Sequence, residues 1–339
     1  MCSSFFWLHI LKKMKKRNNS VEMPIIFFLL LFSPLFTNAQ LSKLVFAPQW
    51  LPQAQFAGYY VAQEKGFYKE AGLDVEIIHP SASKQTTSLL TSGKADLISL
   101  FLITGVSAKN TGLDIVNFGQ ISQHSAILFV TKKSSGIQQL NQLNGKKIGV
   151  WKSGFDEVPK ALMARVECQV EWVPILSSVN LFLMGGIDAM VVMSYNEYDY
   201  IINCGLDKED LNIFPVSEYG FDIPEDGLYC LKSTFDLKKN ELKKFLLATL
   251  KGWNYAANNR KYAVDIVLRR MQSAHLAANR VHQEWMLNEV LEMMSVAGKN
   301  IMPGELLEAD FIKAVCILSD LDRTWQKYSF ADFYKSLLK

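Results

Sequence analysis

Cysteine is scarce in this chain, with five among 339 residues, and histidine is equally rare. Cys2 lies in an N-terminal leader, and the others, Cys168, Cys204, Cys230 and Cys316, are widely and irregularly spaced. No CxxC pair occurs, and no Cys, His and carboxylate spacing fits zinc, so we expect no metal site. Four buried free thiols are the favoured interpretation, although an exported compartment would permit disulfides.

Excess charge is also lacking once the leader is set aside. The whole chain carries +3, but residues 1–39 contain five basic residues and one acidic residue. Their removal leaves 31 basic and 32 acidic residues, a net charge of −1. No basic field remains to attract nucleic acid or anionic lipid, so we expect neither as a partner. Patterns such as GxSxG, HExxH or paired carboxylates are absent as well, so the residues predict no catalytic group and no cofactor.

No apolar run is long enough for a membrane span of about 20 residues. The longest, Pro24–Phe36, follows the basic cluster KKMKKR and ends in Thr37-Asn38-Ala39 before Gln40. This order is typical of a secretory signal peptide, so we expect cleavage after residue 39 and a periplasmic or secreted protein. An uncleaved membrane anchor is the alternative, and Met14 is a possible true start.

Alternating strand and helix patterns run through residues 40–226. Strands are expected at 43–47, 74–79, 97–101, 114–118 and 126–131, with helices at 56–65 and 84–92. A second unit has strands at 147–151, 170–174, 189–193 and 212–215, with helices at 158–166, 178–184 and 194–203. Alternation at this spacing predicts α/β units with mainly parallel sheets flanked by helices.

The chain crosses between these units twice, near Val130–Lys133 and Asp226–Leu231, and then continues as a helical C-terminal tail. We therefore expect residues 40–131 plus 227–339 to form lobe I and residues 132–226 to form lobe II. Tail helices are expected at 241–258, 262–271, 282–295, 310–318 and 330–338. A ligand would bind in the cleft between the lobes, and hinge closure would bury it.

Three groups of polar and aromatic residues follow strands and would line that cleft. Gln49, Trp50 and Tyr59 belong to the first group, with Gln55 and Phe56 beside them. The loop that holds Ser81 and Ser83, together with Ser99–Phe101, forms the second group. The third group comes from the other lobe and consists of Trp151 through Glu157 and Ser194 through Glu197.

Individual members of these groups have competing interpretations. Trp50 can stack on a flat ligand while keeping its N–H free, or it can be a core aromatic. Tyr195, Asn196 and Glu197 follow a strand and can bond a ligand's amino edge, but Ser194 and Glu197 also have the spacing of a capping box. Asp226 is either a ligand contact or a hinge anchor. The histidines, among them His79 and His124, are interpreted as satisfied surface or core groups.

The segment QWLPQAQFAGYYVAQEKGFYKEAGLDVE (Gln49–Glu76) resembles the solute-binding proteins of the family shared by alkylsulfonate-binding proteins and thiamine pyrimidine synthases. The pieces LNGKKIGVW (Leu143–Trp151), SYNEY (Ser194–Tyr198) and EDGLY (Glu225–Tyr229) resemble the same family in the same order. The resemblance implies a two-lobed periplasmic-binding-protein fold of type II. It also moves the interpretation of Asn196 and Glu197 toward ligand binding.

The synthase branch of this family holds pyridoxal phosphate on a lysine and uses a histidine as donor of ring atoms. The corresponding positions here hold Leu100 and Thr104. Leucine has no amine for a Schiff base, which disfavours the enzyme. We therefore expect an exported solute-binding protein that delivers a planar heterocycle, of the class of thiamine pyrimidine precursors, to an ABC permease.

The expected protein is a monomer without cofactor, and Trp50, Tyr59 and Trp151 contact the ring of its ligand. Asn196 and Glu197 bond the amino edge, while Ser81, Ser83 and Ser99 take polar substituents. The alternatives are the thiamine pyrimidine synthase, a sensor ectodomain and a carrier of an unrelated solute such as an alkylsulfonate.

Overall fold

Two five-stranded sheets organise the computed structural model, which describes residues 40–81, 86–151, 155–176, 178–299, 301–321 and 328–338. The expected signal peptide lies outside the described residues. Leu41–Lys339 forms one compact unit. Within the described part of the chain, no helix has the length and apolar character needed to cross a membrane.

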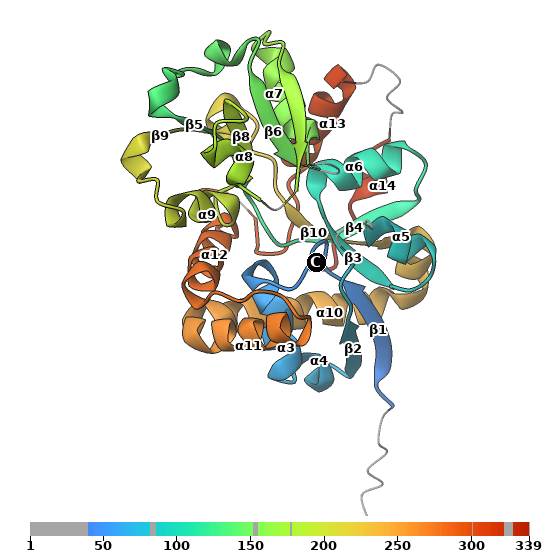
Figure 1. Ribbon diagram of the computed structural model, residues 1–339. Helices are drawn as coiled ribbons and strands as arrows, with labels where there is room; N and C mark the ends of the chain where they lie inside the picture. Colours follow the sequence, from blue (N-terminus) through green and yellow to red (C-terminus); the bar gives the residue numbers. More distant parts are fainter. Residues whose placement is uncertain are drawn as a thin grey trace, which may run out of the picture. The chain divides into compact units, whose positions relative to one another are not determined.

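The first sheet has the strand order β2-β1-β3-β10-β4 (Figure 1). Its strands are β1 (Ser42–Ala47), β2 (Leu73–Ile77), β3 (Leu97–Phe101), β4 (Ile115–Gln120) and β10 (Asp226–Leu231). β1 pairs with β2 and β3 in parallel, whereas β10 is antiparallel to β3 and β4. The sheet is therefore mixed.

The second sheet repeats this arrangement with the order β7-β6-β8-β5-β9. Its strands are β5 (Ile127–Lys132), β6 (Lys147–Trp151), β7 (Glu171–Ile175), β8 (Ala189–Met193) and β9 (Leu211–Pro215). β6 is parallel to β7 and β8, and β5 is antiparallel to β8 and β9. Because β5 pairs with strands of the second sheet, the chain first crosses from the first sheet to the second through residues 121–126. It returns to the first sheet through residues 216–225. The limits of the two lobes stay a prediction.

Helices cover both sheets. Those that precede the second crossing are α3 (Ala57–Glu64), α4 (Phe67–Glu70), α5 (Thr86–Thr91), α6 (Leu102–Asn110), α7 (Glu157–Arg165), α8 (Asn180–Leu183) and α9 (Glu197–Asn203). The C-terminal helices are α10 (Lys232–Asn258), α11 (Arg260–Ser273), α12 (Arg280–Met293), α13 (Glu308–Leu321) and α14 (Phe330–Phe333). α14 is much shorter than the expected helix at 330–338. α6 had no counterpart among the expected helices.

Small residues allow α3 and α10 to pack closely beside the first sheet, as Figure 1 shows. A side chain on Gly252 would lie 2.3 Å from the carbonyl oxygen of Gly58. A side chain on Gly58 would overlap the indole of Trp253. The two glycines therefore set the distance between the helices, and with it the position of the segment that leads from β1 into α3.

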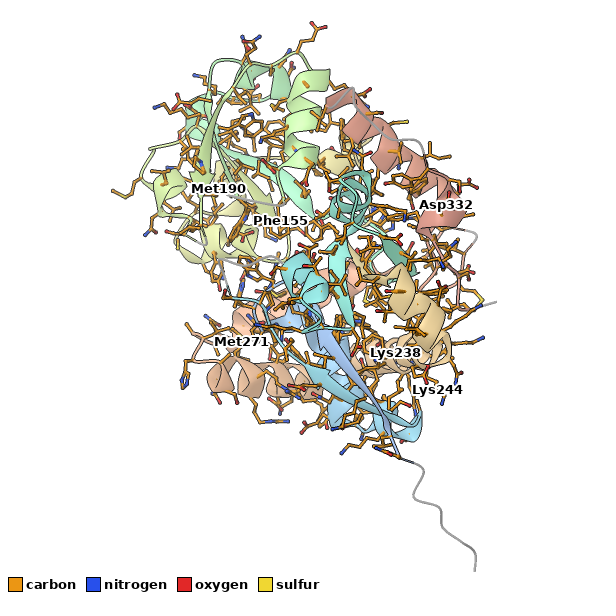
Figure 2. All side chains as sticks on the ribbon, turned by 90° about the vertical axis from the view of Figure 1, so that its right-hand side faces the viewer. Phe155, Met190, Lys238, Lys244, Met271 and Asp332 are labelled. Carbon is orange, nitrogen blue, oxygen red and sulfur yellow. The ribbon has the colours of Figure 1, made fainter. Side chains whose placement is uncertain are left out.

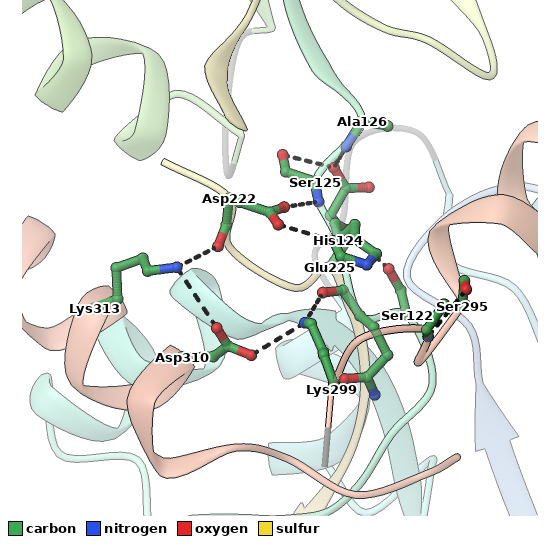
Figure 3. Close-up of polar contacts among 12 residues, drawn as sticks. Ser122, His124, Ser125, Ala126, Asp222, Glu225, Ser295, Lys299, Asp310 and Lys313 are labelled. Atoms are coloured by element: carbon green, nitrogen blue, oxygen red, sulfur yellow. Dashed lines mark hydrogen bonds and ion pairs between the residues drawn. The ribbon is translucent and has the colours of Figure 1, made fainter. Parts of the chain in front are cut away.

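The two crossings are bonded to each other (Figure 3). The Asp222 carboxylate accepts a hydrogen bond from the backbone N–H of Ser125 at 2.9 Å, and its other oxygen lies 2.8 Å from Nδ1 of His124. The Glu225 carboxyl group accepts a hydrogen bond from the backbone N–H of Ala126 at 2.7 Å. Lys313 of α13 donates to the backbone oxygen of Asp222 at 3.1 Å. The C-terminal tail thus braces the crossings.

All four cysteines of the described part are free thiols, as expected. Cys168 and Cys230 are buried, but Cys204 and Cys316 are exposed, so the expectation of four buried thiols is wrong. Cys204 directly follows α9, and Cys316 lies within α13.

Candidate functional site

The carboxyl ends of four strands, two from each sheet, converge on one pocket. β1 leads into Gln49 and Trp50, and β3 ends at Phe101. From the second sheet, β6 ends at Trp151, and β8 ends at Met193 just before Tyr195. Open α/β sheets place ligands at these strand ends. The pocket opens to solvent, and about 30 Å³ of it can hold the centre of a water-sized sphere.

Aromatic rings form most of one wall. The Trp50 and Trp151 ring centroids are 5.6 Å apart at an interplanar angle of 82°. Phe155 lies 6.2 Å from Trp50 and 4.9 Å from Phe101. In Figure 2, Phe155 lies below Met190, where the elements of the two sheets meet. Edge-to-face contacts of this kind are favourable for aromatic pairs, so the wall holds together as a cluster.

A buried carboxyl group forms the polar side. Glu197, which is 1% exposed, accepts a hydrogen bond from the backbone N–H of Met193 at 3.0 Å and from the amide of Asn196 at 2.7 Å. Burial raises the pKa of Glu197 to about 7, although these hydrogen bonds lower it. Glu197 therefore takes both its acid and its carboxylate form near neutral pH.

The capping box, which was one of the two interpretations of this segment, is not formed. α9 begins at Glu197, and Asn196 is the residue that precedes its first turn. The Glu197 carboxylate reaches back to Met193 rather than to Ser194, whose backbone N–H donates to the oxygen of Ala126. The side chain of Glu197 is thus held in the pocket wall.

A hydrogen-bond network lies beneath the pocket. The hydroxyl group of Ser99 accepts from the backbone N–H of Gln49 at 3.0 Å. The Tyr59 hydroxyl donates to the Asp226 carboxylate at 2.8 Å. Burial raises the pKa of Asp226 to about 6, and the hydrogen bonds from Tyr59 and Ser99 lower it. This network fixes the ends of β1, β3 and β10 relative to one another.

His79 anchors Trp50 from behind. Its Nδ1 lies 2.5 Å from the backbone oxygen of Trp50, and its Nε2 lies 2.9 Å from the Tyr60 hydroxyl. Burial lowers the pKa of His79 to about 4, so the ring is neutral at pH 7. Nδ1 then donates to Trp50 and Nε2 accepts from Tyr60. The prediction that His79 is a satisfied group is confirmed.

Six of the eleven residues proposed from the sequence line the pocket: Gln49, Trp50, Trp151, Tyr195, Asn196 and Glu197. Ser99 and Asp226 lie in the network beneath it. Tyr59 is fully buried between Phe46 and Trp253, outside the lining, because its helix face packs into the core. Ser81 is exposed and away from the lining, and Ser83 lies outside the described residues.

Sequence reasoning missed two lining residues, Gln53 and Met193, and one supporting residue, His282. Gln53 follows Trp50 in the same polar loop, which was the available signal. Met193 is the last residue of a buried strand, a position that is typical of a core side chain. His282 belongs to the tail, and only the packing of α12 brings it to the site.

The described residues around the pocket do not fit pyridoxal phosphate. No lysine is among the lining residues that the structure describes. Leu100, at the position where the synthases hold their lysine, is a buried strand residue paired with Gly227. The described part of the chain also contains no cluster of His, Cys, Asp and Glu that could hold a metal ion.

Comparison with known proteins places the chain among relatives of two kinds. It is 27% identical to the Saccharomyces cerevisiae 4-amino-5-hydroxymethyl-2-methylpyrimidine phosphate synthase THI13, over 63% of this chain and 66% of that protein. It is 24% identical to the formylaminopyrimidine-binding protein of Halalkalibacterium halodurans, over 72% and 76%. The match to the Schizosaccharomyces pombe synthase covers only 31% of that protein. The chain therefore spans less than two thirds of these yeast relatives.

Solved structures share the fold. The alkanesulfonate-binding protein SsuA of Xanthomonas axonopodis pv. citri, solved with bound MOPS, superposes with a TM-score of 0.63 at 14% identity. The match covers 87% of this chain and 98% of SsuA. This likeness confirms the periplasmic-binding-protein fold with C-terminal helices. The sequence pattern described as NMT1/THI5 like matches residues 53–263, and the chain belongs to this family.

Proposed function

We propose that this protein is an exported solute-binding protein of an ABC importer, and that it binds a small planar nitrogen heterocycle with an amino group beside a ring nitrogen. Thiamine pyrimidine precursors belong to this class. The observation that carries the proposal is the pocket itself, where indoles from both sheets face a buried carboxyl group.

The aromatic wall suits a flat ligand. Trp50 and Trp151 meet edge to face, so a ring that stacks on one indole contacts the edge of the other unless one indole rotates. Stacking on an aromatic side chain contributes about 1–3 kcal/mol per base in single-stranded nucleic acid binding, and a pyrimidine offers a similar face. Trp50, which His79 anchors through its backbone, is the better placed of the two.

The polar side suits an amino-pyrimidine edge. An amino group donates a hydrogen bond, and the neighbouring ring nitrogen accepts one. The acid form of Glu197 accepts through one oxygen and donates through the other, so it matches both atoms of such an edge. With a pKa of about 7, Glu197 takes its acid form at neutral pH with only a small free-energy cost of protonation.

Relatives support a binding role over the synthase. The Halalkalibacterium halodurans relative is named for binding formylaminopyrimidine, and the match covers more of this chain than that to the yeast enzymes does. Leu100 lacks the amine that a Schiff base requires. The basic and apolar segments of residues 1–39 support export, and the structural likeness to periplasmic proteins supports delivery to a permease. A monomer is the proposed state.

Isothermal titration calorimetry with 4-amino-5-hydroxymethyl-2-methylpyrimidine tests the proposal. We expect wild-type protein to bind this compound, and Trp50→Ala to weaken binding by about 1–3 kcal/mol, or about 5- to 150-fold. Trp172→Ala is the matched control, because Trp172 is half-buried on β7 away from the pocket lining. It should leave the affinity unchanged.

The same titration separates the alternatives. An alkylsulfonate has no ring, so if the protein binds propanesulfonate but not the pyrimidine, and Trp50→Ala has no effect, a sulfonate carrier replaces the proposal. If added pyridoxal phosphate produces a Schiff-base absorbance band, the synthase replaces the proposal. Absence of binding to any heterocycle with an amino edge rejects the proposed ligand class.

A further inference from the structure

Helix α12 contacts the pocket from both sides through two adjacent residues. Gln283 accepts a hydrogen bond from the backbone N–H of Ala54 at 2.7 Å, in the loop that carries the pocket residues Gln53 and Gln55. The preceding residue, His282, contacts α9 and the residue before it, which follow β8 of the second sheet. Both side chains are 1% exposed. α12 therefore joins the two walls, although it lies far from them in sequence.

His282 connects an acidic residue to the pocket. Its Nδ1 lies 2.6 Å from Oδ2 of Asp199, and its Nε2 lies 3.1 Å from Oδ1 of Asn196. Nδ2 of Asn196 in turn donates to Oε1 of Glu197 at 2.7 Å. Tyr200 stacks on the imidazole with ring centroids 4.0 Å apart. The four polar residues form one continuous chain of hydrogen bonds that ends at the pocket.

The direction of each hydrogen bond follows from the atoms involved. A carboxylate and an amide oxygen are both acceptors, so each ring nitrogen of His282 that faces one must carry a proton. In this arrangement Nδ1 donates to the Asp199 carboxylate, and Nε2 donates to the Asn196 oxygen. Asn203 adds a second donor to the same Asp199 oxygen at 2.9 Å.

We propose that Asp199, His282 and Asn196 form a buried relay that fixes the Asn196 amide with Nδ2 toward Glu197, and that His282 is thereby a positioning residue for recognition of the ligand's amino edge. The proposal deepens the proposed function and rests on it for the ligand. Met193 and Asn196 each occupy one oxygen of Glu197 with a donor, so the plane of the carboxyl group is set. Glu197 is also one of the residues that line the pocket.

Loss of the relay has a defined chemical consequence. If His282 no longer donates, the Asn196 amide is free to turn, and its oxygen can face Oε1 of Glu197. Two acceptors then meet, and the carboxyl group rotates away or, in its acid form, turns its O–H to donate a hydrogen bond to the Asn196 oxygen. In either case Glu197 no longer presents the acceptor and donor that an amino-pyrimidine edge requires. The preference for an amino group over an oxo group should therefore fall.

The protonation of His282 is tested directly in the ligand-free full chain. With ¹⁵N-labelled histidine, long-range ¹H–¹⁵N spectra at pH 7.5 should show both ring nitrogens of His282 protonated. In Asp199→Asn, only one should be protonated, because a neutral ring then suffices. A neutral His282 ring in the wild-type protein would overturn the relay, whatever the ligand proves to be.

Selectivity is tested by titrating 4-amino-5-hydroxymethyl-2-methylpyrimidine against its 4-oxo counterpart. His282→Phe keeps the ring that stacks on Tyr200 but removes both donors, and should reduce the amino preference about tenfold or more. Trp285→Phe is the control. It removes another α12 contact, the hydrogen bond from Nε1 to the backbone oxygen of Ser194 at 2.9 Å, and should retain the preference.

The outcomes separate the two proposals. If wild-type protein binds neither pyrimidine, the proposed function fails, and the histidine spectra alone decide the relay. If wild-type protein prefers the amino compound and His282→Phe keeps that preference, the positioning role is refuted while the proposed function stands. An equal loss of preference in His282→Phe and Trp285→Phe shows that α12 packing, and not the relay, matters, and also refutes it.

Discussion

Replacing Glu225 by glutamine should change how the stability of the fold depends on pH. Glu225 lies at the end of the second crossing and is 2% exposed. Burial raises the pKa of its carboxyl group to about 8, the hydrogen bonds from Ala126 and Ser125 lower it, and the nearby Asp226 and Asp222 raise it further. The group is therefore neutral in the folded protein at pH 7.

The sign of the effect follows from proton linkage. Between the ordinary pKa of 4.5 and the folded pKa of about 8, the folded state keeps a proton that the unfolded state has released. The free energy of unfolding must then fall as pH rises through this range, and it levels off above it. At about 1.36 kcal/mol per pKa unit, the difference sets an upper limit of about 5 kcal/mol for this one group.

Urea unfolding at pH 5, 6, 7 and 8 measures the effect. Glu225→Gln keeps an oxygen to accept from Ala126 but cannot ionise, so its stability should fall less than that of wild-type protein over this range. Glu197, with its pKa raised to about 7, contributes to both curves and cancels in the comparison. Glu218→Gln, an exposed position in the same crossing, is the control. Parallel curves for wild-type protein and Glu225→Gln would refute the reasoning.

Two further substitutions test the packing that positions the site. Gly252→Ala should destabilise the fold by more than about 2 kcal/mol in urea unfolding, because its methyl group meets the Gly58 backbone, whereas Lys251→Ala on the exposed face of α10 should cost less than about 1 kcal/mol. Equal costs would contradict the close approach of the helices. His79→Phe removes the donor to the Trp50 backbone and should lower stability by about 1–3 kcal/mol, and it should also raise the Kd for the pyrimidine. An unchanged Kd together with unchanged Trp fluorescence would show that His79 does not hold the indole in place.

The pocket was predictable where local sequence order determines it. Trp50, Trp151 and the Tyr195–Glu197 segment each follow a buried strand, and the carboxyl ends of parallel strands meet at one edge of a sheet. That rule places Trp50 at an edge of the first sheet and brings Trp151 and the Tyr195–Glu197 segment together at an edge of the second. The expected two-lobed arrangement then brings the two edges face to face. Tyr59 failed the same rule because it lies on a helix, where the burial of a side chain depends on which face meets the core.

Other features depend on contacts between distant segments. His282 is an ordinary polar residue in a tail helix, and nothing nearby in sequence indicates its hydrogen bonds to α9. Strand β5 was expected in the first unit because it follows β4 directly, but its antiparallel pairing with β8 and β9 assigns it to the second sheet. α6 was not anticipated because Gly105 weakens its helical pattern. The structure explains this glycine, since a side chain there would lie 2.5 Å from the Tyr229 ring.

The two-sided contact of α12 suggests how binding could be made visible. Val281 is 67% exposed and directly precedes His282 and Gln283, whose side chains bond opposite walls of the pocket. A fluorescent dye attached through Val281→Cys, with the exposed thiols Cys204 and Cys316 replaced by serine, would lie in solvent one residue from His282 and two residues from Gln283. Any ligand that shifts one wall against the other must move this turn of helix, so the emission of the dye would report occupancy, and the protein would serve as an optical sensor that requires no change to the pocket itself.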